Sequence, residues 1–258
     1  MHCDDILLLE NLSMTAFSTN EPTRWPASLR TKRLVRRLGT HHLSLAAATA
    51  STVFCLYITR PYRDVITKLS FSTAYPALVL LVITLWIGPW NLLRGHRTPV
   101  SSDLRRDIGI WAGILGIAHT IIGFCVHMRG RPWLYFIYPR SQHHSFPLRH
   151  DIFGFANETG LIATIILVVL FATSNDYSLR RLGTPRWKQL QRWNYALFLF
   201  VLLHTVAYQT IEKQHAPFVA AVVACSAMTL CLQALGFQRR RTRQSIATGS
   251  GVEEEYEP

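Results

Sequence analysis

Two histidines lie inside long apolar stretches of this 258-residue sequence, His119 and His204. An ionisable side chain inside a membrane-length apolar segment is costly and marks a candidate functional site. The first histidine follows Arg106 by 13 residues and the second follows Arg192 by 12. If both arginines mark the cytoplasmic starts of helices running in the same direction, the histidines reach similar depths, about 19 and 18 Å. Two histidines at one depth on parallel helices meet the requirement for two axial ligands on one haem iron.

An alternative stays open, in which each histidine only forms a hydrogen bond with a neighbouring helix. Zinc and non-haem iron fit less well, because such sites usually need three or four protein ligands, with cysteines or carboxylates nearby. The five cysteines show no CxxC spacing. That absence argues against a zinc site and also against a disulfide framework.

Small and aromatic residues accompany the two histidines in helical register. Gly116 and Gly123 lie three residues before and four residues after His119, and Tyr208 lies four residues after His204. Glycines at these positions would let a porphyrin face approach the backbone, although they equally permit close helix packing. The tyrosine would offer an aromatic wall. We therefore include all three in the predicted cofactor-binding set.

A carboxylate and a histidine-rich loop are further candidates toward the outer side. Glu158 would lie about 7 Å inside the outer end of its span, where it could relay protons near the haem or bind a quinone head group. The alternative is a snorkelling or hydrogen-bonded carboxylate. His143, His144 and His150 form an outer loop that could dock an acceptor or bind metal loosely, and the alternative is a plain solvated loop.

Six apolar spans must position these residues. The sequence is 49% hydrophobic and only 16% charged, which is unlike an ordinary soluble domain. Stretches close to 20 residues long with few charges are typical of membrane-spanning helices. We predict an all-α membrane protein, a bundle of six transmembrane helices, at about 41–59, 74–93, 108–128, 153–173, 193–211 and 217–237.

The distribution of basic residues predicts the orientation of these spans. Of the 27 lysines and arginines, 19 fall in segments on one side of the six spans. The positive-inside rule then places both termini in the cytoplasm. Basic clusters beside spans report topology, so we expect no nucleic-acid partner. We predict an N-terminal cytoplasmic tail at 1–39, the membrane domain at 40–238 and a disordered cytoplasmic tail at 239–258, with no flavin or nucleotide domain on the chain.

Two stretches carry a family resemblance. The run RRDIGIWAGILGIAH (Arg105–His119) resembles the third-helix motif of the ferric reductase-like transmembrane family. The run ATSNDYSLRRLGTPRWKQLQRWNYALFLFVLLH (Ala172–His204) is similar to the approach to that family's fifth helix. Within the family, the pattern resembles the haem-binding membrane subunit of the bacterial methionine sulfoxide reductase system. The resemblance covers about residues 74–237. It implies a multi-pass protein of the bacterial inner membrane that carries b-type haem, with His119 and His204 as ligands.

The same resemblance brings out one departure. The family usually has a second histidine 13 residues before the distal one, where this sequence has Gln191. Glutamine has no imidazole nitrogen, so we expect one haem rather than two. Arg105 and Arg106 lie at the matching depth, where they could contact haem propionates.

The expected function is electron transfer through the membrane. The donor would be quinol or a separate flavin reductase, and the acceptor an outer-side partner similar to methionine sulfoxide reductase, or ferric iron. A different class stays open as the alternative: a non-redox membrane protein, such as a small transporter, whose histidines pack or carry protons.

Overall fold

The computed structural model describes residues 35–95, 102–128, 130–142, 145–213 and 216–253. The chain divides into two compact units, 1–44 and 45–258. In the first unit, residues Leu38–His42 form a short π-helical segment. The second unit contains the long helices, and the predicted functional residues belong to it. Among the described residues there is no β-strand, and only an isolated antiparallel bridge joins Ile137 to Leu148.

The elements that follow are helical. They are α3 (Leu43–Thr59), α4 (Val65–Leu93), α5 (Ser102–Gly123), α6 (Ile152–Ala172), α7 (Asp176–Gln191), α8 (Asn194–Ile211) and α9 (Ala216–Glu253). All except α7 overlap one of the predicted spans, although α4 begins at Val65 rather than at 74 and α5 begins at Ser102 rather than at 108. Two short 3₁₀ turns, Pro132–Tyr135 and Arg140–Gln142, lie between α5 and α6. The all-α prediction is therefore confirmed.

Five helical segments are long and apolar enough to cross a membrane: Val35–Thr59, Val65–Leu93, Ile152–Ala172, Asp176–Ile211 and Ala216–Thr242. The predicted third span, α5, is not among them. Its first two turns contain Asp103, Arg105, Arg106 and Asp107, which lower the hydropathy of a helix that is otherwise apolar. The chain is thus a multi-pass membrane protein by length and composition of its helices.

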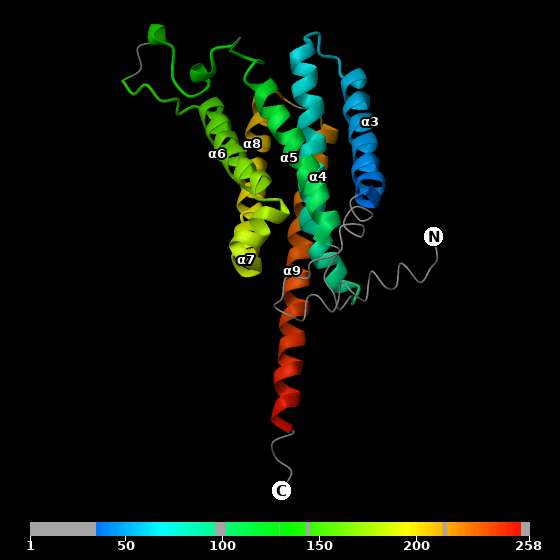
Figure 1. Cartoon of the computed structure of the whole chain (residues 1–258). Helices are drawn as coiled ribbons and strands as arrows, with labels where there is room; N and C mark the ends of the chain where they lie inside the picture. The colour runs from blue at the N-terminus through cyan, green and yellow to red at the C-terminus, as the bar shows by residue number, and fades with distance from the viewer. Residues whose placement is uncertain (1–34, 96–101, 129, 143–144, 214–215, 254–258) are drawn as a thin grey trace. The chain divides into compact units, whose positions relative to one another are not determined.

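Two regions outside the predicted spans are helical. The segment between the fourth and fifth spans is helical, as α7, and is broken at Gly183, whose φ of 73° suits glycine. The predicted disordered tail is helical as far as Glu253 (Figure 1). This stretch contains no proline before Glu253 that would end the helix. Residues 254–258 and most of the predicted N-terminal tail lie outside the described residues.

Four helices enclose a central space. Helices α4 and α6 each pack against both α5 and α8, so that α5 and α8 occupy opposite corners of the group. Helix α9 packs along α4 (Figure 1). The buried apolar core joins α4, α6, α8 and α9 through Leu78, Leu81, Val82, Leu85, Ala163, Leu170, Leu197, Phe198 and Val222.

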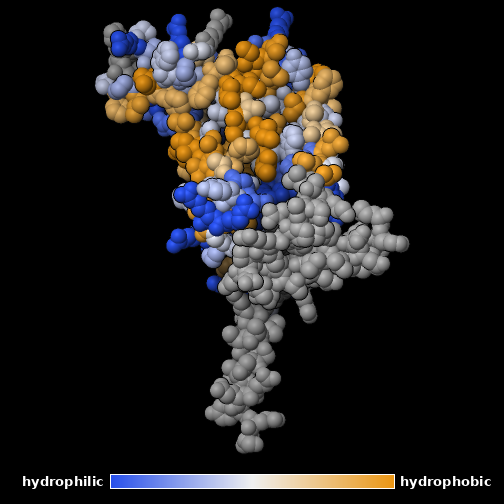
Figure 2. Space-filling view, in the orientation of Figure 1, coloured by the Kyte–Doolittle hydropathy of each residue, from blue (hydrophilic) through white to orange (hydrophobic). Residues whose placement is uncertain are grey.

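The surface of the second unit agrees with a lipid environment. Large apolar side chains point outward, among them Phe54, Ile165 and Leu230, which are 57% to 68% exposed. Figure 2 shows such side chains covering the described helices between zones with more hydrophilic residues. Exposed apolar area of this extent is unusual for a soluble monomer and marks a surface in contact with membrane or partner.

Aspartate side chains cap the first turns of α4 and α6. Asp64 accepts hydrogen bonds from the backbone N–H and the hydroxyl of Thr67, both at 2.8 Å, at the start of α4. Asp151 accepts from the Gly154 N–H at 2.7 Å at the start of α6, and the Arg149 guanidinium donates to its other oxygen at 2.7 Å. These bonds satisfy N–H groups that the first turn of a helix leaves without partners.

Removing the α6 cap is expected to lower stability. Hydrogen bonding from Arg149, with a further bond from the Gly154 N–H, holds the pKa of the Asp151 carboxyl below its usual value. The carboxylate therefore stabilises the fold above its unfolded pKa, and this contribution is lost as pH falls through the lowered folded pKa. Asp151→Ala should cost about 1 kcal/mol near neutral pH, or roughly 2–4 °C in Tm. Thermal unfolding in detergent across pH measures this. Glu158→Ala, an exposed acid on the same helix, is the control, and an equal loss in both variants would contradict the capping role.

Candidate paired-histidine site

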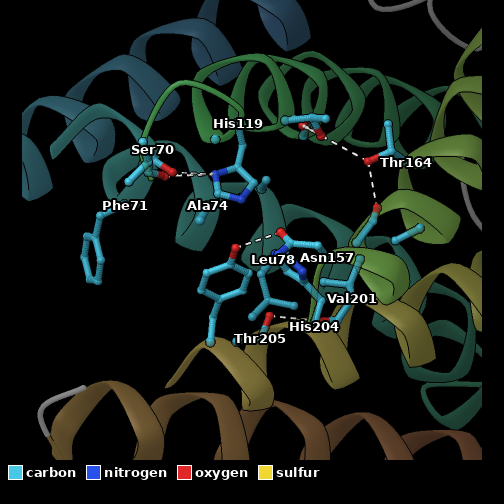
Figure 3. A pocket seen from close by; sticks show the side chains of 18 of the residues that line it. Ser70, Phe71, Ala74, Leu78, His119, Asn157, Thr164, Val201, His204 and Thr205 are labelled. Carbon is cyan, nitrogen blue, oxygen red and sulfur yellow. Dashed lines mark hydrogen bonds between the residues drawn. The ribbon is translucent and has the colours of Figure 1, made fainter. Parts of the chain in front are cut away.

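The enclosed space is a pocket lined by α4, α5, α6 and α8 and by the segment after α5. His119 reaches it from α5 and His204 from α8 (Figure 3). Their ring centroids are 6.2 Å apart, with the ring planes at 75°. The sequence prediction that these two histidines meet at one level of the bundle is consistent with this geometry.

Each histidine is held by a backbone carbonyl of a neighbouring helix. The Nδ1 of His119 lies 3.0 Å from the Ser70 carbonyl oxygen on α4, and the Nδ1 of His204 lies 2.7 Å from the Ala156 carbonyl oxygen on α6. A carbonyl oxygen can only accept a hydrogen bond, so each Nδ1 carries the proton. In the neutral ring, Nε2 then keeps its lone pair. This is the tautomer and the support that metal-bound histidines usually have.

Two buried threonines share these carbonyl oxygens. The hydroxyl of Thr73 is shared between Leu69 O at 2.8 Å and Ser70 O at 3.0 Å. The hydroxyl of Thr159 is shared in the same way between Phe155 O at 2.8 Å and Ala156 O at 2.9 Å. Both threonine side chains are buried. Each histidine support is therefore built in the same way, from one carbonyl and one hydroxyl three residues later on the same helix.

The spacing of the two rings fits a metal-centred group between them. An imidazole nitrogen binds a transition metal at about 2 Å, which puts the centroids of two rings sharing one ion about 6 Å apart. No cluster of three or more histidine, cysteine, aspartate or glutamate side chains occurs within the described ranges. The donor set is thus two imidazoles in a largely apolar pocket, as a haem with two axial histidines requires.

Glycines allow the helices around the two histidines to pack closely. A Cβ on Gly160 of α6 would lie 2.6 Å from His204 Nδ1, so only glycine lets the imidazole reach the α6 backbone. A Cβ on Gly116 would meet Leu167 of α6 at 2.6 Å, which makes this position a helix contact as well as part of the pocket lining. Gly123 lines the pocket, and nothing lies within 4 Å of the position that a Cβ would take there.

Gly160 was not among the site residues predicted from the sequence. Its signal was the small, polar run Asn157–Gly160 inside an apolar span, from which we singled out the charged residue Glu158 instead. In the structure Glu158 is exposed and does not line the pocket. Its neighbour Asn157 does, and accepts a hydrogen bond from the Tyr208 hydroxyl at 2.8 Å. The prediction of Glu158 as a proton relay at this pocket is therefore not supported by its position, because successive helical residues face different sides.

Tyr208 lines the pocket beside His204. Its ring centroid lies 4.9 Å from that of His204, and the ring is stacked on His127 with the centroids 6.1 Å apart. His127 was not among the predicted site residues. It lines the pocket, and its Nε2 lies 3.4 Å from a carboxylate oxygen of Glu212. Spacing along the sequence could not reveal this pair, because the partners are 85 positions apart on different elements.

The two arginines lie away from the pocket lining. Arg106 forms ion pairs with Asp103, at 3.7 Å, and with Asp176 on α7. Arg105 packs toward Gly88 of α4. Neither side chain is among the pocket-lining residues, and contacts from them to propionates stay a prediction.

Gln191 and the histidine-rich loop are also separate from the pocket. Gln191 ends α7, where its backbone carbonyl accepts from the Asn194 side chain at 3.0 Å, and its own Nε2 is buried without a described hydrogen-bond partner. His150 is exposed on the loop before α6. His143 and His144 lie outside the described residues.

Apolar helices of membrane-spanning length around two supported imidazoles define a helical membrane protein with a candidate paired-histidine site. Residues 73–202 match the family described as ferric reductase like transmembrane component. This is half of the chain, which therefore belongs to that family. The match includes His119 and Gln191 and ends two residues before His204.

Curated relatives are similar over a longer region. The chain is 28% identical over 179 residues to the protein-methionine-sulfoxide reductase haem-binding subunit MsrQ of Ralstonia nicotianae, covering 69% of this chain and 76% of that protein. It is 30% identical over 139 residues to the MsrQ subunit of Bordetella pertussis, and the same holds for that of Bordetella bronchiseptica. These matches cover 53% of this chain and 59% of the Bordetella proteins.

A methyl group at Gly160 should disturb the histidine support. Because its Cβ would fall 2.6 Å from the His204 ring, Gly160→Ala must push the ring or the helix away, at a cost of about 1–3 kcal/mol. Thermal unfolding of the purified protein measures the loss. Gly123→Ala is the matched control, since nothing lies within 4 Å of its Cβ position, and it should change stability by less than about 0.5 kcal/mol. Equal stability of both variants would show that the close contact at Gly160 has no energetic weight.

Proposed function

We propose that this chain is a haem-b electron-transfer subunit of the membrane, with His119 and His204 as the two axial ligands. The observation that carries the proposal is the pair of imidazoles 6.2 Å apart, each donating its Nδ1 proton to a carbonyl and keeping Nε2 for a metal. Relatives named as haem-binding subunits support the choice of haem.

Haem bound here would supply reversible one-electron chemistry. The residues of the chain would hold the haem, orient its ligands and exclude water. The carbonyls of Ser70 and Ala156 fix the orientation of the two rings and increase the basicity of Nε2. Leu78, Ala112 and Leu167 are among the apolar residues that line the pocket and exclude water, which favours a low reorganisation of the surroundings during electron transfer. Gly123 leaves space for a flat ligand beside α5.

We further propose six membrane spans, with α5 as the third and both termini in the cytoplasm of a bacterial inner membrane. Helix α5 is required for this count because His119 projects from it into the pocket. The end of α5 and the end of α8 lie on the same side of the bundle, since His127 and Glu212, which follow them, are in contact. This agrees with two parallel helices running outward.

The proposed donor and acceptor are the ones expected from the sequence. The acceptor would be an outer-side partner of the methionine sulfoxide reductase type, in keeping with the names of the relatives, or ferric iron. The donor would be quinol, or a flavin reductase on another chain. Quinol is favoured, because a cytoplasmic flavin would lie about 19 Å from the histidine level without a relay haem.

Replacing either histidine should abolish the haem spectrum. The reduced wild-type protein is expected to show a Soret band with sharp α and β bands, as low-spin haem with two imidazoles does. His119→Ala and His204→Ala should each lose the low-spin bands, as seen by visible spectroscopy of purified, dithionite-reduced protein. His150→Ala, which changes an exposed histidine, should keep them. A folded but colourless wild-type protein from haem-replete cells would instead support the non-redox alternative.

One haem per chain is expected. Glutamine at position 191 offers no imidazole for a second iron, and the pyridine haemochrome assay against protein concentration counts the haem directly. A ratio of two would mean that other ligands act at the cytoplasmic level. If the ratio is one, Gln191→His tests whether the missing imidazole is what limits the count, and a rise toward two would identify this position as the cause.

A further inference from the structure

We propose that His127 and Glu212 form a proton-accepting pair for a lipid-soluble hydroquinone that binds in the outer part of the pocket. The proposal rests on the proposed function, because the hydroquinone would deliver its electrons to the haem held by His119 and His204. It assigns to these two residues the role for which Glu158, exposed and outside the pocket lining, is not positioned.

The pair lies where two helix ends meet. Helix α5 ends at Gly123, and four residues later His127 is fixed through its backbone N–H, which donates to the Tyr135 hydroxyl at 2.9 Å. That hydroxyl in turn donates to the Gly123 carbonyl at 2.8 Å. Helix α8 ends at Ile211, and Glu212 follows directly. Lys213 then adopts a left-handed conformation with φ of 46°, which turns the chain away and leaves Glu212 at the tip, 3.4 Å from His127.

The contact defines which ring nitrogen can accept a proton. Glu212 approaches Nε2 of His127, so a neutral ring that donates from Nε2 keeps its lone pair on Nδ1. Among the residues that the structure describes, none forms a hydrogen bond with Nδ1 of His127. A carboxylate behind an imidazole orients the ring and stabilises the imidazolium that forms when the ring takes a proton, which is the arrangement used in general-base catalysis.

The titratable groups around His127 come from three elements. Tyr135 lies on the connection after α5, and its ring centroid is 6.4 Å from that of His127. Tyr208, which belongs to α8, is stacked on the His127 imidazole. Glu212 is the charged neighbour. Both His127 and Glu212 keep about one third of their side-chain surface exposed, at 32% and 33%. A proton taken from inside the pocket therefore has a direct exit.

The pair is also close to the paired-histidine site. The ring of Tyr208 lies 4.9 Å from His204 and 6.1 Å from His127, so the two histidine rings are within about 11 Å of each other. All three side chains line one pocket. Proton acceptance and electron acceptance are thus neighbouring events at the outer end of the bundle.

The remaining walls fit an aromatic ligand that arrives from the membrane. The outer part of the pocket is lined by rings from the start of α4 and from the segment after α5: Tyr62, Phe71, Tyr75, Phe124 and Phe136. Flat rings stack favourably with such side chains. A hydroquinone combines an aromatic ring, solubility in lipid and two O–H bonds that must lose their protons when the electrons leave.

The reaction balances as follows. Each hydroquinone loses two protons and two electrons and becomes a quinone. Each O–H bond breaks as its proton forms an N–H bond at Nδ1 of His127, which releases it to water at the outer face while Glu212 compensates the positive charge. A haem held by His119 and His204 would supply the one-electron acceptor, and the outer acceptor would reoxidise it so that both electrons can leave.

The test uses the haem-loaded protein in lipid nanodiscs, with decylubiquinol as the reductant. Stopped-flow absorbance at the Soret band should show haem reduction slowed about 100-fold in His127→Gln, the lower range for loss of a general base, and slowed in Glu212→Gln. Reduction by dithionite should be equal in all proteins.

Binding gives a second readout that does not depend on turnover. Decylubiquinol, titrated calorimetrically into the same nanodiscs after the protein has been reduced with dithionite, should bind about 3–10-fold more weakly to His127→Gln, as expected for the loss of one hydrogen bond from its O–H to Nδ1. The matched controls are His150→Gln and Glu158→Gln, which change an exposed histidine and an exposed glutamate and should behave as wild type. If His127→Gln loses its haem, Glu212→Gln, which preserves the shape of the side chain, decides the question.

The outcomes separate this proposal from the proposed function. A wild-type protein without a low-spin haem spectrum contradicts the proposed function itself. A normal spectrum combined with wild-type reduction rates and binding in both His127→Gln and Glu212→Gln overturns the proton-accepting pair and leaves the haem site standing. A normal spectrum without any reduction by decylubiquinol also overturns the pair.

Discussion

The site depends on one constraint, that an imidazole N–H inside an apolar bundle needs an acceptor. A polar group left unpaired in such surroundings costs several kcal/mol, and neither His119 nor His204 has an acceptor on its own helix. Each finds one on a neighbour: α4 supplies the Ser70 carbonyl and α6 supplies the Ala156 carbonyl. These two bonds fix the tautomer of the rings, and they also tie the pair of helices that carry the histidines to the pair that does not.

The rest of the arrangement serves those two bonds. Gly160 lets the His204 ring reach the α6 backbone, and Gly113, whose Cβ would lie 2.5 Å from the Phe171 ring, lets α5 approach the same helix lower down. Thr73 and Thr159 add a hydroxyl to each accepting carbonyl. Small residues and hydroxyls are the usual means of close helix contact in membranes, where burial of apolar area gives little driving force between helices. The shape of the pocket therefore depends on how closely α5 and α8 pack against α6.

Polar groups at the helix ends have a different environment from those at the centre of the bundle. Asp64, Asp151 and Glu212 all stand at helix ends, two as caps and one opposite His127. There these side chains keep partial contact with solvent, whereas His119 and His204 point into the pocket between the helices. Polar groups thus lie toward solvent at the ends of α5 and α8, and the paired histidines lie in the pocket between the helices.

The sequence by itself determined the helical class, the approximate spans and the matched depth of His119 and His204, because hydropathy and the rise per residue are properties of a single segment. It also determined that Gln191 offers no imidazole. Only the tertiary structure decided that Glu158 faces outward and Asn157 inward, that Gly160 supports His204, and that His127 meets Glu212. Those outcomes depend on the rotation of each helix about its own axis and on which helices are neighbours, and both are set by packing between segments far apart in the chain.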